Sequence, residues 1–260
     1  MLQPRKSALL LGGTSEIGLE ILAALAAQGY NRFSLGAREP ETALASLTAR
    51  LRATTPEPSM HSFRWDATEI ASHQSVLAEV FVEHGPFDAV ICAVGALGHH
   101  AGLTMAPTEV AAMIATNASG PCAALAAVAD LLTNQRSGDP GRSLIVVISS
   151  VAAARARKSN FVYGASKSCL DAYAQGLRDA CVGSGIEVLI LRPGFVRTRM
   201  TAGLTPAPMA TTPEVVAAAA AKAIVNHRGG VLWIPARLGP LMAILRNLPI
   251  GLWRRVAGDR

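Results

Sequence analysis

The chain has 260 residues, of which 50% are hydrophobic and 16% are charged, and its formal net charge is +6. This composition is sufficient for one well-buried α/β domain. The basic balance suits an anionic ligand or surface but is too mild to indicate nucleic acid, and no basic stripe with interleaved aromatic residues is present, so we expect no nucleic-acid partner.

Apolar runs of strand length alternate with helix-length segments along the whole chain. The predicted strands are Ala8–Leu11, Arg32–Leu35, Met60–Arg64, Ala89–Val94, Leu144–Ile148, Val188–Leu191 and Val231–Ile234. The predicted helices are Glu16–Ala27, Thr42–Ala53, Ser75–Glu83, Pro107–Thr116, Ala123–Gln135, Val162–Val182 and Pro213–Asn226. Strands rich in Val, Ile and Leu without alternation are typical of a parallel sheet buried on both faces. The pattern predicts an α/β fold with a doubly wound, mainly parallel sheet of about seven strands and helices on both faces.

The first strand passes directly into a glycine-rich turn and a helix, in the sequence "LLLGGTSEIGLEI". A tight turn at this point lets backbone N–H groups and the start of the helix face a diphosphate. Gly12 and Gly18 hold the outer positions of a GxxxGxG pattern, and Glu16 replaces the middle glycine. An ordinary strand-to-helix turn is the alternative, but the position at the very first such unit favours a dinucleotide site.

The second strand ends in "FSLGAREP", where a dinucleotide-binding fold places the residue that meets the adenosine ribose. An acidic residue there binds the 2′-hydroxyl of NADH, whereas an arginine accommodates the 2′-phosphate of NADPH. Arg38 occupies this region and no carboxylate precedes it. The sequence therefore favours NADPH, with an ordinary solvated arginine as the alternative.

The stretch "FVYGASKSCLD" places Tyr163 and Lys167 four residues apart, with only small residues between them. Residues at this spacing share a helix face. An ammonium beside a phenol lowers the phenol's pKa from about 10 toward neutral pH. Such a tyrosine can donate a proton to a carbonyl oxygen while hydride reaches the carbon. The small intervening side chains leave room for a cofactor.

Other polar residues follow buried strands in positions that suit the same chemistry. Ser150 comes directly after a strand, where its hydroxyl can orient a carbonyl. Asn117 lies in an otherwise apolar helix, either as a satisfied core amide or as the holder of a water that connects to Lys167. Pro193-Gly194 ends a later strand, and Thr198 follows it within reach of a nicotinamide carboxamide.

Together these motifs resemble the short-chain dehydrogenase/reductase family over almost the whole chain. The resemblance implies a Rossmann-type fold, an NAD(P)(H) cofactor, a homo-oligomer and a catalytic set of Asn117, Ser150, Tyr163 and Lys167, with no metal. It also implies an NADP-binding domain over residues 1–236, with residues 237–260 as an amphipathic C-terminal segment of the same domain. The implied cofactor contacts are Gly12, Thr14, Ser15, Glu16, Ile17, Gly18, Arg38, Asp66, Ala67, Ala93, Gly95, Tyr163, Lys167, Pro193, Gly194, Val196 and Thr198.

The chain departs from the family pattern at two places. Glu16 stands where the family has a glycine, which bears on how the diphosphate sits. "CAVG", from Cys92 to Gly95, stands where the family usually has Asn-Asn-Ala-Gly. The second departure affects the structural role of the first asparagine rather than the chemistry.

Four segments resemble a narrower group: "LLGGTSEIGL", "RARKSNFVYGASKSCLDAYAQGL", "RPGFVRTRMTAGLTPAP" and "VLWIPARLGPLMAILRNLPIGLWRR". They are similar to the actinobacterial keto-reductases that convert decaprenylphosphoryl-ribose to its arabinose epimer, and to their paralogues. In that pathway an oxidase forms a 2-keto furanose on a polyprenyl phosphate and the reductase delivers hydride to it. The resemblance implies a lipid-linked keto-sugar substrate, a partner oxidase and a role in making cell-wall arabinan precursors.

Two features of the chain fit a lipid phosphate. Arg155, Arg157 and Lys158 lie between Ser150 and Tyr163, where they can pair with a phosphodiester, or else form an ordinary solvated loop. The C-terminal segment carries an apolar stripe with arginines around it, either as an interfacial anchor or as a packing helix. The stripe consists of Leu241, Ile244, Leu245 and Leu248, followed by Leu252 and Trp253, and the arginines are Arg237, Arg246, Arg254 and Arg255.

Several readings remain open from the sequence. A soluble ketone, steroid or acyl substrate fits the same chemistry, and a non-catalytic NADP(H)-sensing scaffold is a third possibility that the intact catalytic set disfavours. The scattered cysteines show neither CxxC motifs nor paired metal ligands, which favours reduced thiols and a cytoplasmic protein. The sequence contains no signal peptide pattern and no run of the ~18 apolar residues needed to span a bilayer. We expect a soluble protein with possible contact at the inner face of the plasma membrane.

Overall fold

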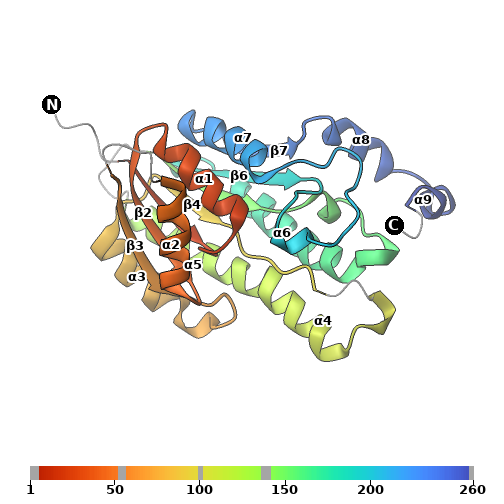
Figure 1. The fold of residues 1–260 in the computed structure, drawn as a ribbon, viewed down its shortest axis with the longest axis horizontal. Helices are drawn as coiled ribbons and strands as arrows, with labels where there is room; N and C mark the ends of the chain where they lie inside the picture. Colours follow the sequence, from red (N-terminus) through yellow and green to blue (C-terminus); the bar gives the residue numbers. More distant parts are fainter. Residues whose placement is uncertain (1–5, 52–56, 99–101, 136–141, 258–260) are drawn as a thin grey trace.

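Seven parallel strands form one continuous sheet in the computed structural model, which describes residues 6–51, 57–98, 102–135 and 142–257 apart from the side chains of 256 and 257. The strands are β1 (Lys6–Leu11), β2 (Tyr30–Ala37), β3 (Ser59–Arg64), β4 (Ala89–Cys92), β5 (Ser143–Ile148), β6 (Ile186–Pro193) and β7 (Gly230–Ile234). Their order is β3-β2-β1-β4-β5-β6-β7, and the sheet runs from left to right in Figure 1. The predicted fold class is confirmed. The chain reverses direction across the sheet between β1 and β4, so a crevice opens at their carboxyl ends.

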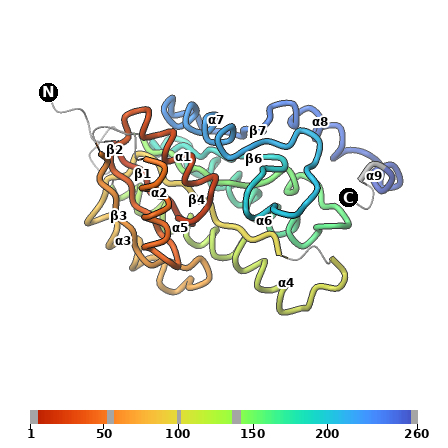
Figure 2. Tube along the Cα trace, viewed as in Figure 1, coloured from red at the N-terminus to blue at the C-terminus, as the bar shows by residue number. Residues whose placement is uncertain are grey.

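Helices cover both faces of this sheet. The helices α1 (Glu16–Ala26), α2 (Pro40–Leu51) and α7 (Pro213–Val225) pack on one face, and α3 (His73–His84), α5 (Gly120–Gln135) and α6 (Phe161–Ala180) pack on the other. Figures 1 and 2 show α4 (Pro107–Ile114) projecting on one side, and α8 (Leu238–Leu245) and α9 (Ile250–Ala257) beyond β7. Short single turns are η1 (Ile70–Ser72), η2 (Gly102–Thr104), η4 (Val151–Ala153), η5 (Lys158–Asn160) and η6 (Arg199–Thr201), and η3 (Ala115–Ser119) is a π-helical turn.

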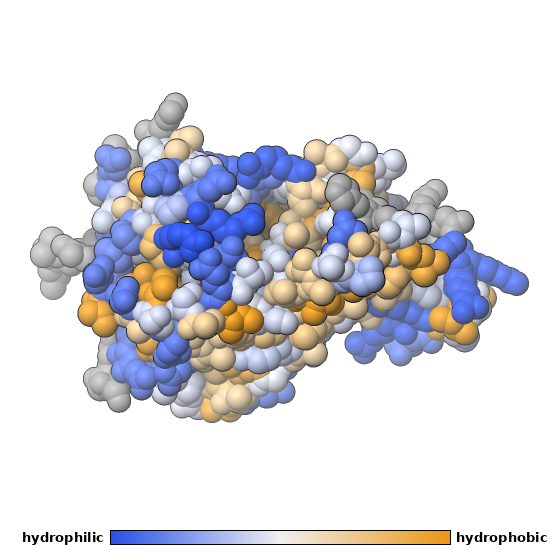
Figure 3. Space-filling model, turned by 90° about the horizontal axis from the view of Figure 1, so that it is seen from below, coloured by the Kyte–Doolittle hydropathy of each residue, from blue (hydrophilic) through white to orange (hydrophobic). Residues whose placement is uncertain are grey.

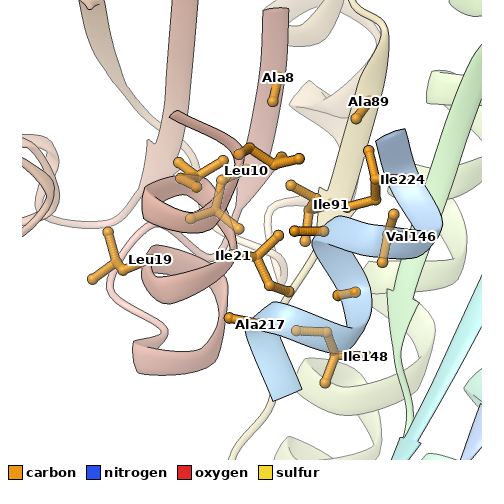
Figure 4. Close-up of a cluster of buried hydrophobic side chains, with 14 of the residues drawn as sticks. Ala8, Leu10, Leu19, Ile21, Ala89, Ile91, Val146, Ile148, Ala217 and Ile224 are labelled. Atoms are coloured by element: carbon orange, nitrogen blue, oxygen red, sulfur yellow. The ribbon is translucent and has the colours of Figure 1, made fainter. Parts of the chain in front are cut away.

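Successive residues of each strand pack alternately into two cores. Leu10 of β1 and Ile91 of β4 face α1 and α7, and Figure 4 shows them beside Ile21 and Ile224 of those helices. Leu9, the neighbour of Leu10, belongs to the opposite core. All five side chains are fully buried, and burial of each contributes about 1.5–3 kcal/mol. The apolar strands predicted from the sequence thus fix the two-sided sheet.

One continuous helical run covers residues 107–135, where the sequence predicts two separate helices. Gly120 and Pro121 suggest a break, but the π-turn η3 absorbs the irregularity and α5 begins at Gly120. A Cβ at Gly120 would collide with the carbonyl of Ala67, so a glycine is needed there for the helix to approach so closely. The predicted and observed ends of the other elements differ by one to three residues. Ala53, the predicted end of α2, lies outside the described residues.

The run Pro107–Gln135 is also the one described helix that is long and apolar enough to cross a membrane by length and composition. Leu125, Val128 and Leu132 are fully buried against the sheet, and 44% of the most apolar window is buried. Its hydrophobic character is therefore accounted for by packing in the core of this fold.

The C-terminal segment differs from the predicted single stripe. The helix α8 ends at Leu245, so Leu248 lies in the turn before α9 rather than on the helix. Trp253, predicted to flank the stripe at an interface, is instead buried. Four large apolar side chains of this segment stay exposed: Leu241, Ile244, Ile250 and Leu252. Pro249 lacks the N–H that would continue the first helix, which explains the break.

Candidate active site

The glycine-rich turn after β1 is built as the sequence predicts. Gly12 has a φ of +89°, and a Cβ there would lie 3.1 Å from the backbone of Ala93. Ser15 caps α1, because its hydroxyl accepts the N–H of Gly18 at 3.2 Å. A Cβ at Gly18 would lie 2.7 Å from a methyl carbon of Leu10, so the glycine lets α1 sit close to the strand. These positions together leave open space in front of the helix start.

This turn forms one wall of a groove of roughly 640 Å³, which is within the range of small-molecule sites. Most of the predicted cofactor contacts line it: Gly12, Thr14, Ser15, Glu16, Ile17, Arg38, Asp66, Ala67, Ala93, Gly95 and Thr198. Trp65, Thr116, Arg199 and Met200 also line it and were not predicted. The groove, the tight turn and the helix start fit a dinucleotide, because small residues occur where a diphosphate must approach the backbone.

Charged groups gather at the end of the groove next to β2 and β3. Asp66 accepts the amide N–H and the hydroxyl of Thr68, both at 2.8 Å. These bonds, opposed by partial burial and helped by the nearby Arg38 and Arg64, lower the pKa of Asp66. The Arg38 side chain is exposed on the groove wall. The end that would hold the adenosine therefore presents one cation and one ionised carboxylate.

Ser150 and Tyr163 meet at the carboxyl edge of the sheet. Ser150 follows β5 and is buried, and its hydroxyl lies close enough to the Tyr163 phenol on α6 to influence the pKa of that phenol. Burial raises the pKa of Tyr163, and the neighbouring Ser150 hydroxyl opposes that rise. The phenol is thus held protonated at neutral pH, in the form that donates a proton.

Lys167 does not lower the pKa of Tyr163 in the way the sequence suggests. Its ammonium donates to the carbonyls of Val94 at 3.0 Å and of Ile148 at 3.1 Å, so it is held between the ends of β4 and β5. Burial lowers the pKa of Lys167 to about 8. Desolvation is the largest influence on the pKa of both groups: it raises the pKa of the Tyr163 phenol and lowers that of the Lys167 ammonium. The prediction that the pKa of Tyr163 is lowered is therefore wrong.

Asn117 lies in the π-turn and is fully buried. Its Oδ1 accepts the N–H of Ala96 at 2.7 Å, and its Nδ2 donates to the Ala96 carbonyl at 2.7 Å and to the Ser166 hydroxyl at 3.0 Å. Both amide hydrogens are therefore used by protein groups, as expected for the core-amide alternative. The side chain fixes the segment after β4 beside Lys167, because Gly95 lies between them.

A buried ion pair supports the Ser150 region and was not predicted. Asp171 on α6 accepts from Arg192 Nε at 2.9 Å, from Arg192 Nη2 at 2.6 Å and from the Ser149 hydroxyl at 2.5 Å. Arg192 also lies 4.8 Å from the centre of the Trp233 ring. The network joins α6, β5, β6 and β7 beside the catalytic hydroxyls. The sequence could have pointed to Asp171, because this residue lies one helical turn after Lys167.

Glu16 contacts a segment from the opposite wall of the groove. Its Oε2 accepts the backbone N–H of Arg199 at 2.6 Å and lies 3.4 Å from Arg199 Nε. Arg199 Nη2 donates to the Thr14 carbonyl at 2.9 Å. The carboxylate that replaces a glycine thus bonds to the segment after β6 rather than filling the groove.

The predicted residues after β6 divide into two sets. Thr198 lines the groove, whereas Val196 is buried and pairs with Thr211 through a single β-bridge. Gly194 lies under α8, since a Cβ there would be 2.8 Å from Leu238 Cδ1. The Pro193-Gly194 turn therefore serves to seat α8, and Thr198 is the residue of this segment that faces the groove.

The three basic residues before Tyr163 differ in their contacts and exposure. Arg155 donates through Nη1 to the carbonyls of Leu245 and Leu248, at 2.6 and 2.9 Å, so its guanidinium is engaged by the C-terminal segment. The prediction that Arg155 binds substrate stays a prediction, and the structure shows a second role for this side chain. Partial burial lowers the pKa of Arg157, and Lys158 is exposed at the surface. A small cavity lined by Leu97, Met105, Met113 and Val162, among others, adjoins Tyr163.

Comparison with known proteins places this site in context. Residues 6–208 match the family described as short chain dehydrogenase. An uncharacterized oxidoreductase of Mycobacterium tuberculosis is 42% identical over 95% of this chain and 96% of its own length. Another, from Streptomyces coelicolor, is 38% identical over 97% of this chain and 96% of its own. A Brucella melitensis 3-oxoacyl-[acyl-carrier protein] reductase solved with NAD is 25% identical and covers 91% of this chain and 98% of its own, with a TM-score of 0.77.

Proposed function

The chain belongs to the short chain dehydrogenase family and is an NAD(P)-dependent oxidoreductase, and from this premise we propose that it is an NADPH-dependent keto-reductase. The observation that carries the proposal is that the Tyr163 phenol and the Ser150 hydroxyl lie together at the carboxyl edge of the sheet. Lys167, on the same helix as Tyr163, lies against Gly95 of the groove wall. A neutral phenol held by a second hydroxyl is suited to bind and protonate a carbonyl oxygen.

Each residue of the site has a separate role in the reduction. When bound, a reduced nicotinamide would supply the hydride for the carbonyl carbon. Tyr163 gives its proton to the carbonyl oxygen as negative charge develops there, and Ser150 orients that oxygen and the phenol. Lys167, whose pKa is lowered to about 8, lies near enough to the working pH to replace the proton that the phenol loses. Asn117 holds the Ala96 segment in place beside Lys167.

The preference for NADPH rests on Arg38. Its exposed guanidinium stands on the groove wall near Asp66, where the 2′-phosphate of NADPH would meet a cation. Asp66 Oδ1 accepts both hydrogen bonds from Thr68. The other lone pairs of the carboxylate remain for the adenine. A charged arginine on a phosphate forms strong, charge-assisted hydrogen bonds.

We propose a polyprenyl-phosphate keto-pentose as the substrate, as the narrower sequence resemblance implies. Arg157 and Lys158 precede Tyr163 and carry positive charge that could meet a phosphodiester. Arg155 donates to the carbonyls of Leu245 and Leu248 in the C-terminal segment. Such a keto-sugar arises by oxidation of an alcohol, so an oxidase would act before this enzyme. The product would be the epimeric alcohol used in cell-wall arabinan precursors.

A substrate with a polyprenyl tail would bring the enzyme to the inner surface of the membrane. The exposed Leu241, Ile244, Ile250 and Leu252 lie on α8 and α9 with four exposed arginines around them. Figure 3 shows hydrophobic and strongly hydrophilic side chains next to each other at the end of the molecule that carries α9. Apolar side chains flanked by cations suit the boundary of an anionic bilayer.

A 3-oxoacyl or other soluble ketone is the second candidate substrate. The Brucella melitensis protein named as a 3-oxoacyl-[acyl-carrier protein] reductase matches at 25% identity, which favours an acyl ketone as the alternative to a sugar. The catalytic steps assigned to Ser150 and Tyr163 are the same for either substrate.

A turnover screen separates these substrates. NADPH consumption is followed with a polyprenyl-phosphate keto-pentose and with soluble and 3-oxoacyl ketones, each with and without anionic vesicles. We expect the lipid-linked sugar to give the highest kcat/KM, and only in the presence of vesicles or detergent. Faster turnover of a soluble ketone with no effect of vesicles would favour the second candidate.

A further inference from the structure

Two segments that line the groove are joined by a contact between Glu16 and Arg199. Glu16 belongs to the glycine-rich turn and Arg199 to the segment after β6, 183 positions later in the chain. The carboxylate accepts the Arg199 backbone N–H at 2.6 Å, and Arg199 Nη2 returns a hydrogen bond to the Thr14 carbonyl at 2.9 Å. Thr14, Glu16 and Arg199 all line the groove.

The segment that carries Arg199 is held in a fixed shape. The backbone N–H of Thr198 donates to the Thr201 hydroxyl at 3.0 Å, and that hydroxyl donates to the Val196 carbonyl at 2.6 Å. Movement of Arg199 therefore carries Thr198 with it. The contact with Glu16 fixes Thr198, which faces the groove, relative to the start of α1.

The charges explain why a carboxylate is tolerated beside a diphosphate. An isolated Glu16 would repel the cofactor's phosphates, because the negative carboxylate and the negative phosphates would lie close together at the positive end of α1. Arg199 brings a cation to the same place and leaves the pair neutral. Its side chain is 73% exposed and that of Glu16 25%, so salt and solvent weaken the contact enough for it to open.

We propose that Glu16 and Arg199 form a clasp over the cofactor's diphosphate, which must open before NADPH or NADP can leave. This clasp rests on the proposed binding of NADPH in the groove. Glu16 and Arg199 are positioning residues that act on cofactor exchange and not on the proton transfer by Tyr163. The replacement of the family's glycine by glutamate thus gives this chain a slower release of cofactor.

Stopped-flow release of NADPH tests the clasp. Enzyme loaded with NADPH is mixed with excess NADP, and the loss of bound-NADPH fluorescence gives the release rate constant. The variants are Glu16→Gly, Arg199→Ala and the double variant. Glu20→Gln is the matched control, because Glu20 pairs with Arg50 at 2.7 Å on the same helix.

We expect Glu16→Gly to raise the release rate constant about tenfold. Arg199→Ala should raise it less, because this variant loses the side-chain bonds but keeps the backbone N–H that donates to Glu16. The double variant should release NADPH faster than either single variant, because each single substitution leaves one hydrogen bond between the two segments in place. Glu20→Gln should leave the rate unchanged. Added salt should accelerate release from the wild type more than from Glu16→Gly, since the clasp is exposed. Arg199→Ala changes one mostly exposed side chain, so this variant should fold normally.

Unchanged or slower release from Glu16→Gly and from the double variant would overturn the clasp. Slower release in Glu16→Gly would mean that the carboxylate repels the diphosphate. These results overturn the clasp alone when the wild type binds NADPH. A wild type that binds no NADPH would contradict both the clasp and the proposed cofactor.

Discussion

The Arg155 guanidinium carbon lies 4.6 Å from the centre of the Trp253 ring, so the segment before Tyr163 is packed against α9. Trp253 Nε1 also donates to the Ala156 carbonyl at 3.3 Å. Gly164, directly after Tyr163, faces Ala156 as well, since a Cβ there would lie 3.5 Å from the Ala156 Cα. The C-terminal segment is thereby coupled to the catalytic helix through two neighbouring residues.

Loss of the Trp253 ring should release the C-terminal segment. Trp253→Ala removes the contact with Arg155, so we expect trypsin to cleave at Arg246 and Arg254 at least about fivefold faster than in the wild type. Trp253→Phe keeps a ring over the guanidinium and should remain close to the wild type. Equal cleavage rates for Trp253→Ala and the wild type would show that Arg155 and Trp253 do not hold the segment.

The exposed apolar residues of α8 and α9 predict vesicle binding. A variant with aspartate at Leu241, Ile244, Ile250 and Leu252 should lose co-sedimentation with anionic vesicles while NADPH still binds. Unlike deletion of everything after Pro235, it keeps the buried Leu238, Met242 and Trp253 that seat the segment.

The control for this experiment is Val82→Asp with Val182→Asp, at positions that are 87% and 83% exposed and far from α8 in the chain. This control should sediment like the wild type. If the wild type itself fails to sediment with vesicles, the C-terminal segment is a packing element. A soluble ketone is then favoured over the lipid-linked sugar as the substrate.

Cofactor choice should depend on Arg38. Arg38→Ala is expected to weaken NADPH binding at least about tenfold and NADH binding no more than about threefold, because only NADPH carries the 2′-phosphate. Arg64→Ala is a suitable control, since that guanidinium already pairs with Glu69 at 2.7 Å. Fluorescence titration with both cofactors measures the dissociation constants. Equal weakening of both cofactors in Arg38→Ala would contradict the assignment.

The lowered pKa of Lys167, about 8, should appear in the pH dependence of stability. The unfolded chain keeps the lysine proton up to about pH 10.4, whereas the folded chain releases it near 8, so the unfolded state binds more protons in between. The wild type should therefore gain stability relative to Lys167→Met as the pH rises from about 8 to about 10, by up to about 1.4 kcal/mol per pH unit. Urea unfolding of both proteins at several pH values measures this difference. A difference that does not vary with pH would contradict the burial of a lysine that must lose its charge.

Local patterns in the sequence were sufficient for the sheet and for much of the site. Buried strands such as Leu144–Ile148 have no competing interpretation, because an uninterrupted run of β-branched and leucine residues fits a strand covered on both faces. Tyr163 and Lys167 were predicted from their four-residue spacing on one helix, and Ser150 was predicted from its place directly after a strand. The groove residues of the first turn were found for the same reason.

Contacts between distant segments could not be found in this way. Nothing near Glu16 in the sequence points to Arg199, and nothing near Arg155 points to Leu245, Leu248 or Trp253. The π-turn around Asn117 was also missed, because a single inserted residue leaves the apolar pattern of a helix nearly unchanged. The direction of the pKa shift of Tyr163 depends on burial, which spacing alone does not reveal.

The central claim is that Tyr163 protonates the substrate in a site that binds NADPH. The most direct measurement compares the wild type with Tyr163→Phe for NADPH affinity and for turnover on whichever ketone the wild type reduces fastest. We predict a dissociation constant within about twofold of the wild type and a fall in turnover of at least about 100-fold, because only the proton donor is lost. Comparable turnover by Tyr163→Phe and the wild type would contradict the claim.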